Sequence, residues 1–225
     1  MKYKLIRSKR STIAIHIRKD ATLEVRAPLK TSKADIDRFV MSKQDWITRH
    51  LAQMEQHVSN KAEFTIKYND TVPMQGEEYP VVARDGNQAG FDGDCFFLPP
   101  GLAPGELKRV IIQVYRLVAK KLLTNKVIDY SKQMSVMPTA VKINGAKTRW
   151  GSCSGRNSIN FSWRLVMADD EVIDYVVVHE LAHIREHNHS EGFWRVVASV
   201  LPDYKRRHKK LKELQQRLAN EDWDN

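Results

Sequence analysis

The positions of the hydrophobic residues divide this chain into a first part with strand-like alternation and a second part with helical spacing. In residues 12–18, apolar side chains at 13, 15 and 17 alternate with others, and Leu23 and Val25 repeat the pattern after a polar turn. This alternation predicts two strands that begin a β-meander. Residues 64–67, 79–82 and 95–98 are further predicted strands between Gly, Asp and Asn turns. The first part is therefore expected to form a small sheet.

One predicted helix interrupts these strands. Ser32 is a suitable N-cap residue, Asp35 stands at the capping-box position, and one apolar stripe follows. The stripe consists of Ile36, Phe39, Val40, Ile47, Leu51 and Met54. A stripe of this kind is typical of a helix that buries one face in a core.

The segment 99–105 is rich in Pro and Gly and is the best candidate for a linker. After it, apolar residues recur at helical spacing from Leu107 and predict a long amphipathic helix to about Met134. We therefore expect an α+β protein with a boundary near residue 102. Residues 1–102 would be a β-rich N-terminal domain with one amphipathic helix, and residues 103–225 a mainly helical C-terminal domain.

The expected second domain contains a short antiparallel sheet and three further helices. Strands are predicted at residues 141–144 and 158–166, on either side of the polar loop 151–155. Helices are predicted at about 171–187, 190–200 and 203–218. The first of these is apolar nearly all round, which indicates a buried helix.

Length and composition set limits on the class of protein. A chain of 225 residues with 42% hydrophobic residues can bury a core without staples. Two cysteines are too few for a disulfide framework and favour a reduced, cytoplasmic setting. There is no stretch of 18 apolar residues and no signal-peptide pattern, so we expect no membrane partner.

The net charge is +10, from 37 Lys and Arg against 27 Asp and Glu. Such a surface attracts nucleic acid, anionic metabolites or acidic proteins, and the attraction weakens with salt. The densest basic run, residues 205–210, is more typical of a solvated helix face than of a binding site, and no known nucleic-acid motif accompanies it. Nonspecific nucleic-acid binding is thus a hypothesis only.

Candidate chemistry centres on the pentapeptide His179, Glu180, Leu181, Ala182, His183. On a helix, two histidines four apart lie on one face and can bind one ion, while Glu180 lies beside them. Catalytic zinc takes three protein ligands and keeps a fourth position for water, whose pKa it lowers to roughly 7. The pattern therefore predicts a hydrolytic zinc site.

The third ligand can be argued from helix geometry. His187 would extend the same face, but three histidines spread over about 12 Å cannot share one ion. His189 can reach the ion only if the helix ends near residues 186–188 and the chain turns back. Asn188 suits such an end, because Asn tolerates the left-handed conformation.

Two other ligands remain open. The His183 to His189 spacing equals that of the metzincins, but Glu186 stands where that motif has Gly. A Glu from the next helix, Glu191 or one further downstream, could be the ligand instead. Cys153 is a possible ligand in principle, yet it would fill the position that water needs.

Four segments of the chain, residues 147–153, 160–165, 171–183 and 188–194, together resemble the YgjP-like metal-dependent hydrolases. These are relatives of the SprT-like and WLM metallopeptidases. The resemblance implies a zincin-like catalytic domain with His179, His183 and His189 as zinc ligands and Glu180 as catalytic acid and base. It implies peptide-bond hydrolysis, although some members of the group have been linked to nucleotide hydrolysis.

The residues that contact substrate are less well defined. An extended peptide would add to the edge of a sheet beside the metal helix, and residues 160–165 are our candidate for that edge, with an interior strand as the equal alternative. Arg149, Arg164 and Tyr204 are candidates to stabilise a negative charge that develops in the transition state, and each is also a plausible scaffold residue. Phe193 and Trp194 are expected to anchor the core.

Three enzymatic hypotheses follow. The first is a zinc metallopeptidase acting on peptides or proteins. The second is a nucleoside triphosphate phosphohydrolase, which the sequence disfavours because it has no Gly-rich phosphate loop and no carboxylate cluster for magnesium. The third is a SprT-like protease that acts in association with nucleic acid. A purely structural zinc site is disfavoured, because Glu180 would have no purpose there.

Overall fold

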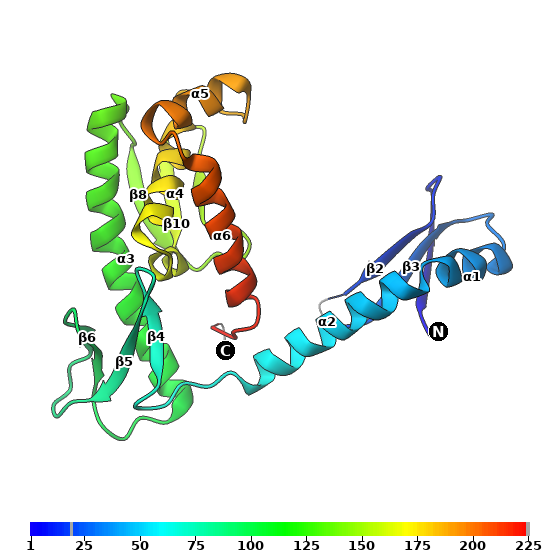
Figure 1. Cartoon of the computed structure of the whole chain (residues 1–225), viewed down its shortest axis with the longest axis horizontal. Coiled ribbons are helices and arrows are strands. Elements are labelled where there is room, and N and C mark those ends of the chain that lie inside the picture. The colour runs from blue at the N-terminus through cyan, green and yellow to red at the C-terminus, as the bar shows by residue number, and fades with distance from the viewer. Residues whose placement is uncertain (19, 224–225) are drawn as a thin grey trace. The chain divides into compact units, whose positions relative to one another are not determined.

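The computed structural model describes residues 1–18 and 20–223 and shows two compact units (Figure 1). The first is Met1–Phe64 with Leu218–Asp222, and the second is Thr65–Arg217 with Trp223. The boundary that we expected near residue 102 lies inside the second unit. The structure divides the chain after Phe64 instead.

The first unit contains a three-stranded sheet. The strands are β1 (Lys4–Ser8), β2 (Ala14–Ile17) and β3 (Leu23–Pro28), in the order β1-β3-β2. The expected antiparallel pair of β2 and β3 is confirmed. β1 was not predicted, and it runs parallel to β3, so the sheet is not the meander we expected. The sheet thus has β3 at its centre.

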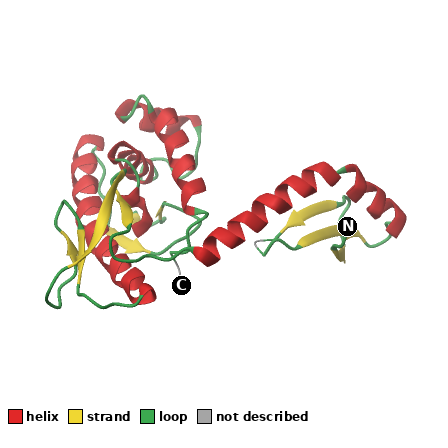
Figure 2. Ribbon diagram, turned by 60° about the horizontal axis from the view of Figure 1, so that its bottom comes forward, coloured by secondary structure: helices red, strands yellow, loops and turns green. Residues whose placement is uncertain are grey.

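The predicted helix is two helices, α1 (Lys33–Ser42) and α2 (Gln44–Glu63), which lie on one side of the sheet (Figure 2). Ser32 caps α1 as predicted, because its side chain accepts a hydrogen bond from the Asp35 N–H. The break lies at Lys43, whose backbone has φ −111° and ψ 13°. It allows Ile36 and Ile47, one on each helix, to enter the same buried cluster with the core residues of β3.

A four-stranded sheet opens the second unit. Its strands are β4 (Thr71–Met74), β5 (Glu77–Ala83), β6 (Gly90–Phe91) and β7 (Phe96–Leu98), in the order β4-β5-β7-β6. The strands predicted at 79–82 and 95–98 are confirmed. The strand predicted at 64–67 is wrong, because Asp70 closes a turn there by accepting a bond from the Lys67 N–H, and β4 begins after that turn.

This sheet packs against α3 (Pro104–Met134), the long helix that the sequence predicted. The Tyr115 hydroxyl donates to the Pro73 carbonyl at 2.6 Å, and the rings of Phe96 and Tyr115 lie 5.1 Å apart. The Pro- and Gly-rich segment is a turn between β7 and α3, with Gly101 at φ +80°. Residues 65–102 therefore share a core with α3, and the segment 99–105 is not a linker between domains.

A second sheet in this unit has the order β8-β10-β9, formed by β8 (Ala140–Asn144), β9 (Gly151–Cys153) and β10 (Ser158–Ser162). β8 runs parallel to β10 and β9 antiparallel, so the sheet is mixed and not purely antiparallel as expected. The predicted polar loop contains β9. The predicted strand 158–166 ends early, and its second half is the buried 3-10 helix η1 (Trp163–Met167).

The remaining helices are α4 (Asp170–Ala182), α5 (Glu191–Val200) and α6 (Tyr204–Leu218). α4 is buried along most of its length, as its apolar sequence predicted. In the part of the chain that the structure describes, no helix combines the length and the apolar character that a membrane span requires.

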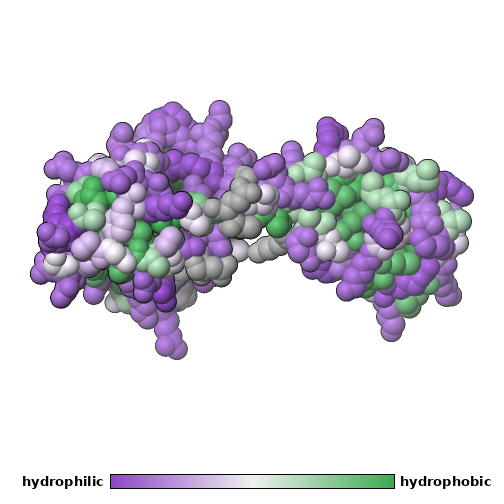
Figure 3. All heavy atoms as spheres, turned by 90° about the horizontal axis from the view of Figure 1, so that it is seen from below, coloured by the Kyte–Doolittle hydropathy of each residue, from purple (hydrophilic) through white to green (hydrophobic). Residues whose placement is uncertain are grey.

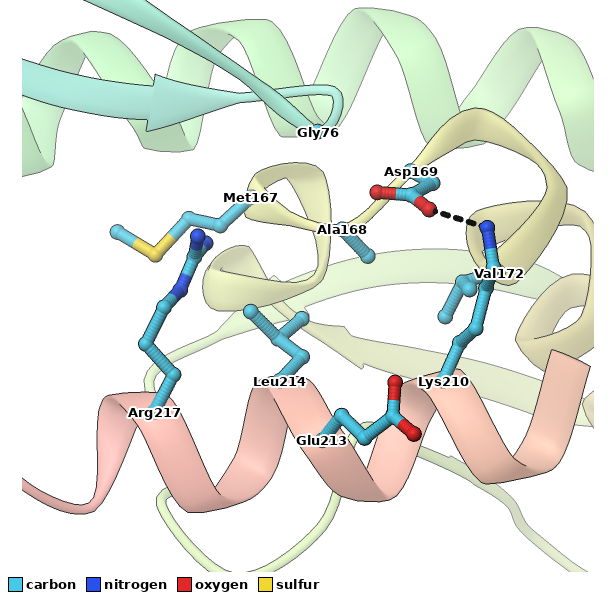
Figure 4. Close-up of a pocket in the computed structure, with 9 residues that line it drawn as sticks. All are labelled: Gly76, Met167, Ala168, Asp169, Val172, Lys210, Glu213, Leu214 and Arg217. Carbon is cyan, nitrogen blue, oxygen red and sulfur yellow. Dashed lines mark hydrogen bonds and ion pairs between the residues drawn. The ribbon is translucent and has the colours of Figure 1, made fainter.

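Salt bridges join the basic run of α6 to the first turn of α4. Both terminal nitrogens of Arg206 donate to the Glu171 carboxylate, at 2.8 and 2.6 Å, and Lys210 lies 2.6 Å from Glu171 and 2.9 Å from Asp169. Acidic residues in a first helical turn are also favoured by the helix dipole. Lys210 and Asp169 meet across a cavity of about 380 Å³ (Figure 4). Three members of the run, Arg206, Arg207 and Lys210, are thus tied to acidic groups of the protein itself.

Glu171→Gln should show what the salt bridges of Glu171 with Arg206 and Lys210, here called the α4–α6 clamp, contribute to stability. Hydrogen bonds from Arg206 and Lys210 lower the pKa of Glu171 from 4.5 to about 2. The stabilisation is therefore present above about pH 4.5 and is lost as the pH falls towards 2. We expect the variant to be less stable at pH 7 by about 1 kcal/mol, since the pairs are partly exposed, and the gap from wild type to close below pH 3. Thermal melts between pH 2 and 7 measure this.

Glu213→Gln is the matched control, because it removes the same charge from an exposed position on α6. A gap that stays constant with pH, or an equal loss in the control, contradicts the clamp.

Candidate metal centre

Three histidines converge at the end of α4. His179 lies in its last turn, His183 is its C-cap residue, and His189 lies in the loop before α5. One ring nitrogen from each lies within 4.8 Å of the others, and Nε2 of His179 is 3.1 Å from Nε2 of His189. Two nitrogens that bind one tetrahedral ion at 2.0–2.1 Å are roughly 3.3 Å apart. The three side chains therefore fit a single small cation.

The alternative ligands do not join this group. Of the residues described by the structure, the cluster with metal-ligand spacing contains neither Glu191 nor Cys153. Burial, aided by the charge of Glu180, also raises the pKa of the Cys153 thiol, which disfavours the thiolate that zinc requires. The histidine set is the one that the geometry supports.

The chain reverses earlier than the sequence predicted. α4 ends at Ala182 instead of near residues 186–188, and a hydrogen-bonded turn follows, in which the Glu186 N–H donates to the Ala182 carbonyl at 3.0 Å. The backbone of Asn188 does not adopt the positive φ that we expected. Ser190 then caps α5 by accepting from the Phe193 N–H at 3.3 Å. The early end gives the chain room to bring His189 back towards His179.

Backbone and hydroxyl groups orient two of the imidazoles. Nδ1 of His183 lies 3.0 Å from the Glu186 carbonyl oxygen, which can only accept, so Nδ1 carries the hydrogen and Nε2 is free to bind an ion. Nδ1 of His179 lies 3.5 Å from the Tyr175 hydroxyl. Glu186, at the position where the metzincin motif has Gly, thus helps through its backbone carbonyl.

Aromatic rings hold the cluster in place. The buried ring of Phe193 contacts all three imidazoles, with centroid distances of 4.5 to 4.9 Å. Trp194 stacks on His189 at 5.7 Å, and Tyr204 stacks on Trp194 at 5.1 Å. The predicted anchoring role of Phe193 is confirmed by its complete burial. Tyr204 is therefore connected to His189 through one intervening ring.

Burial keeps the imidazoles in the form that binds metal. It lowers the pKa of His179 to about 3, with smaller effects from His183 and His189, and it lowers the pKa of His183 as well. Neutral imidazole is the species that ligates zinc, so a buried pair of this kind binds a cation without first losing protons.

Glu180 lies beside the cluster and has an unsatisfied oxygen. Its side chain is only 5% exposed, and Oε2 has no hydrogen-bond partner among the described residues. Burial raises the pKa of Glu180 to about 8, and Arg149 opposes this shift. A buried polar atom without a partner is costly, which is typical of a group that meets a ligand or water. Three converging imidazoles and the unpaired carboxyl oxygen of Glu180 together fit a divalent cation.

β9 passes directly over Glu180. A Cβ atom on Gly151 would lie 2.5 Å from Oε1 and 2.6 Å from Cγ of Glu180, so no larger side chain fits there. The sequence pattern places Gly151 in a polar loop and does not predict this close approach. An isolated Gly within a short strand is the signal that could have revealed it, because it often marks a close approach.

A cavity of about 200 Å³ opens beside His179 and Glu180. Its lining residues are Trp150, Gly151, Tyr175, Val176, His179, Glu180, His208 and Leu211.

Sequence reasoning missed two of these residues, Tyr175 and His208. Their rings stack at 5.7 Å, and burial raises the pKa of Tyr175 to about 12, which keeps its hydroxyl protonated. His208 was hidden in the basic run. Its spacing from Tyr204 and Leu211, one turn to each side on α6, is the pattern that could have shown that this face is turned inward.

The three candidate substrate-contacting residues lie in different surroundings. Arg149 is exposed and close enough to Glu180 for its charge to lower the pKa of that carboxyl group. Arg164 is 8% exposed, donates to the Gly145 carbonyl at 3.1 Å and lies over the Trp163 ring. These contacts favour a scaffold role for Arg164, whereas Arg149 and Tyr204 remain near the cluster.

Three histidines converge beside the buried carboxyl group of Glu180, under the edge strand β9. This is the arrangement of a metal-dependent hydrolase. Comparison with protein families agrees with this class. The family model described as YgjP-like, metallopeptidase domain, matches residues 11–214, and the chain belongs to this family. It is accordingly a hydrolase of a metallopeptidase family.

Two solved structures show a partial likeness. The metallopeptidase zymogen abylysin of Pyrococcus abyssi is 21% identical, with a TM-score of 0.39, over 44% of this chain and 97% of that protein. The zymogen jannalysin of Methanocaldococcus jannaschii is 20% identical, with a TM-score of 0.37, over 42% of this chain and 95% of that protein. No curated protein sequence matches the chain.

Gly151→Ala should disturb the site through its contact with Glu180. A methyl group 2.5 Å from Oε1 must displace Glu180 or β9, and we expect a loss of stability of about 1–3 kcal/mol, as for other overpacked positions. Urea unfolding of the variant, together with its zinc content after dialysis, measures the effect.

Gly155→Ala is the control, since a Cβ there meets nothing within 4 Å. It should stay within about 0.5 kcal/mol of wild type. Equal stability of the two variants would mean that β9 does not lie against Glu180.

Proposed function

We propose that this protein is a zinc-dependent peptidase in which His179, His183 and His189 hold the ion and Glu180 transfers protons. The observation that supports this most directly is the convergence of three imidazole nitrogens beside the orphaned Oε2 of Glu180. Three ligands leave a coordination position open, which is what distinguishes catalytic from structural zinc sites.

When bound, zinc would supply Lewis acidity that polarises the scissile carbonyl and acidifies water. Glu180 would take a proton from the attacking water as its hydroxyl adds to the carbonyl carbon. The same carboxyl group would then deliver that proton to the amine nitrogen as the C–N bond breaks. Burial suits both roles, because it makes the Glu180 carboxylate a stronger base and allows its protonated form to persist near neutral pH.

The substrate strand would pair with β9. Our sequence-based candidate, residues 160–165, is excluded as an edge, because β10 has β8 and β9 on its two sides and residues 163–165 are helical. β9 is one of the two outer strands of this sheet, and it is the one that lies over Glu180. Backbone hydrogen bonds from such an edge favour an extended peptide over a nucleotide.

A negative charge that develops on the substrate oxygen requires a donor near Glu180. We propose Arg149 first, because its charge already acts on Glu180, and Tyr204 second, because it packs on Trp194 beside His189. Arg164 is less well suited, since its guanidinium is committed to Gly145 and Trp163.

The alternative, a nucleoside triphosphate phosphohydrolase, has less support. Phosphate transfer commonly relies on magnesium held by carboxylates. Across residues 1–18 and 20–223, the cluster with metal-ligand spacing consists of histidines alone. The site as described therefore fits peptide hydrolysis better.

We further propose a reducing, cytoplasmic setting. Both thiols, Cys95 and Cys153, are free in the structure, as a reducing compartment would leave them.

Glu180→Gln should retain zinc and lose turnover by about 10²–10⁴-fold, the usual contribution of a general acid and base. The zinc-loaded variant and wild type are compared on an unfolded protein and, side by side, on nucleoside triphosphates. Glu191→Gln, at an exposed position on α5, is the control and should remain active. Full activity of Glu180→Gln refutes the role of Glu180, and wild-type turnover of triphosphates alone refutes the peptidase.

His189→Ala should weaken zinc binding by more than about 100-fold, since the loss of a ligand exceeds the 10–100-fold cost of changing groups that support ligands. His187→Ala is the matched control, because His187 is exposed and lies outside the cluster. Zinc affinity is measured by competition with a chromogenic chelator. If Glu191→Gln loses zinc and His189→Ala does not, the third ligand is Glu191.

A further inference from the structure

Positive charge is densest in the first 64 residues of this protein. Residues 1–64 contain 14 Lys and Arg against 7 Asp and Glu, a net charge of +7, whereas the whole chain has +10. Residues 1–18 alone contain six Lys and Arg and no acidic residue. Six positive charges without a carboxylate in one short segment must either face solvent or contact acidic groups from elsewhere.

The strand register shows where these charges lie. Odd-numbered apolar residues, such as Leu5, Ile15 and Val25, pack into the core under α1 and α2. Successive side chains of a strand point to opposite faces, so the even-numbered residues lie on the other face. Lys4, Glu24 and His16 form one row across the three strands, and Arg26 lies in the next. α1 and α2 both lie on the core side, so neither of these two helices covers the basic face (Figure 2).

The basic face contains one carboxylate, and that carboxylate is covered. Glu24 is 3% exposed and accepts hydrogen bonds from Arg18 at 2.9 and 2.5 Å and from Arg26 at 2.8 Å. These bonds hold the pKa of Glu24 below its usual value, so it stays charged and fixes both guanidinium groups. The groups that a ligand meets on this face are therefore mainly cationic.

The basic run of the second unit is arranged differently. There Arg206, Arg207 and Lys210 pair with acidic residues of α4 and of the α6 start, so much of their charge is used within the fold. Hydrophilic residues cover most of the visible surface of each unit, and smaller hydrophobic patches lie among them (Figure 3). A local excess of cations over carboxylates, rather than polarity in general, distinguishes the even-numbered strand face of the first unit.

The loop between β1 and β2 extends the basic face. Lys9 is exposed, the Nε of Arg10 is buried without a hydrogen-bond partner in the described structure, and the hydroxyls of Ser11 and Thr12 follow. Arg, Lys, Ser and Thr are among the side chains that contact phosphate oxygens in protein–DNA complexes. The loop thus offers both charge and hydrogen bonds to a phosphate backbone.

We propose that the basic face of β1–β3, together with residues 9–12, binds the phosphate backbone of double-stranded nucleic acid without reading its sequence. The even-numbered strand positions carry no Phe, Tyr or Trp, which argues against single strands, whose bases stack on large aromatic rings. They also lack the large apolar groups that insert into a membrane surface, apart from Ile6. This binding is independent of the proposed peptidase activity.

The test uses the full-length protein and a fluorescent 25-base-pair DNA duplex, with anisotropy measured between 50 and 200 mM salt. We expect binding that weakens steeply with salt. Lys4→Gln with Lys9→Gln removes two exposed cations and should reduce the slope of log K against log salt by about 1.8, with roughly 100-fold weaker binding at 50 mM salt. Lys120→Gln with Lys121→Gln, on exposed positions of α3, is the matched control and should bind as wild type does.

Circular dichroism melts establish that both double variants are folded. No duplex binding by wild type at 50 mM salt overturns the proposal, as does an equal loss in both double variants, which would mean a general charge effect. Binding to vesicles of phosphatidylglycerol but not to DNA would identify a membrane partner instead. Because none of these measurements uses proteolysis, their outcome is separate from that of the peptidase assays.

Discussion

The metal site of the second unit depends on where helix α4 ends. Two histidines on α4 can meet an ion alone, but the third can join them only if the chain reverses within the six residues from His183 to His189. The turn after Ala182, the Ser190 cap and the Phe193 ring produce that reversal together. At the other end of α4, its acidic first turn is tied to α3 through Lys126 and to α6 through Arg206 and Lys210. The site is therefore positioned from both ends of one buried helix.

Burial lowers the pKa of the histidines of this site and raises the pKa of Glu180, and both shifts have the same cause. It favours the neutral forms, so the imidazoles of His179 and His183 can bind a cation without first losing a proton, while the carboxyl group of Glu180 holds its proton more tightly than usual. A bound cation would offset the cost of burying these groups, since it stabilises the Glu180 carboxylate and accepts the lone pairs of the imidazole nitrogens. The same residues without an ion are a costly arrangement, which explains why a fold would keep them only for function.

The parts of this structure that local spacing determines could be predicted, and the parts that depend on distant contacts could not. The HExxH motif, the helix of residues 104–134, and the strands at 79–82 and 95–98 follow from short-range patterns. The boundary at residue 64 does not, because it reflects contacts between distant segments of the second unit, such as the bond between Tyr115 and Pro73, 42 residues apart. Gly151 and His208 gain their positions from contacts with Glu180 and Tyr175 on another element. The end of α4 was misplaced because the turn after Ala182 has no Gly or Pro to mark it.

The shortness of β9 has a consequence for the behaviour of the molecule in a concentrated solution. An exposed strand edge is a template on which a second copy of the chain can align and aggregate. β9 spans only Gly151–Cys153, too few residues for two copies to form a lasting ladder. So short an edge can pair with a peptide segment that other contacts hold in place, but it offers a second copy of the chain little to align on.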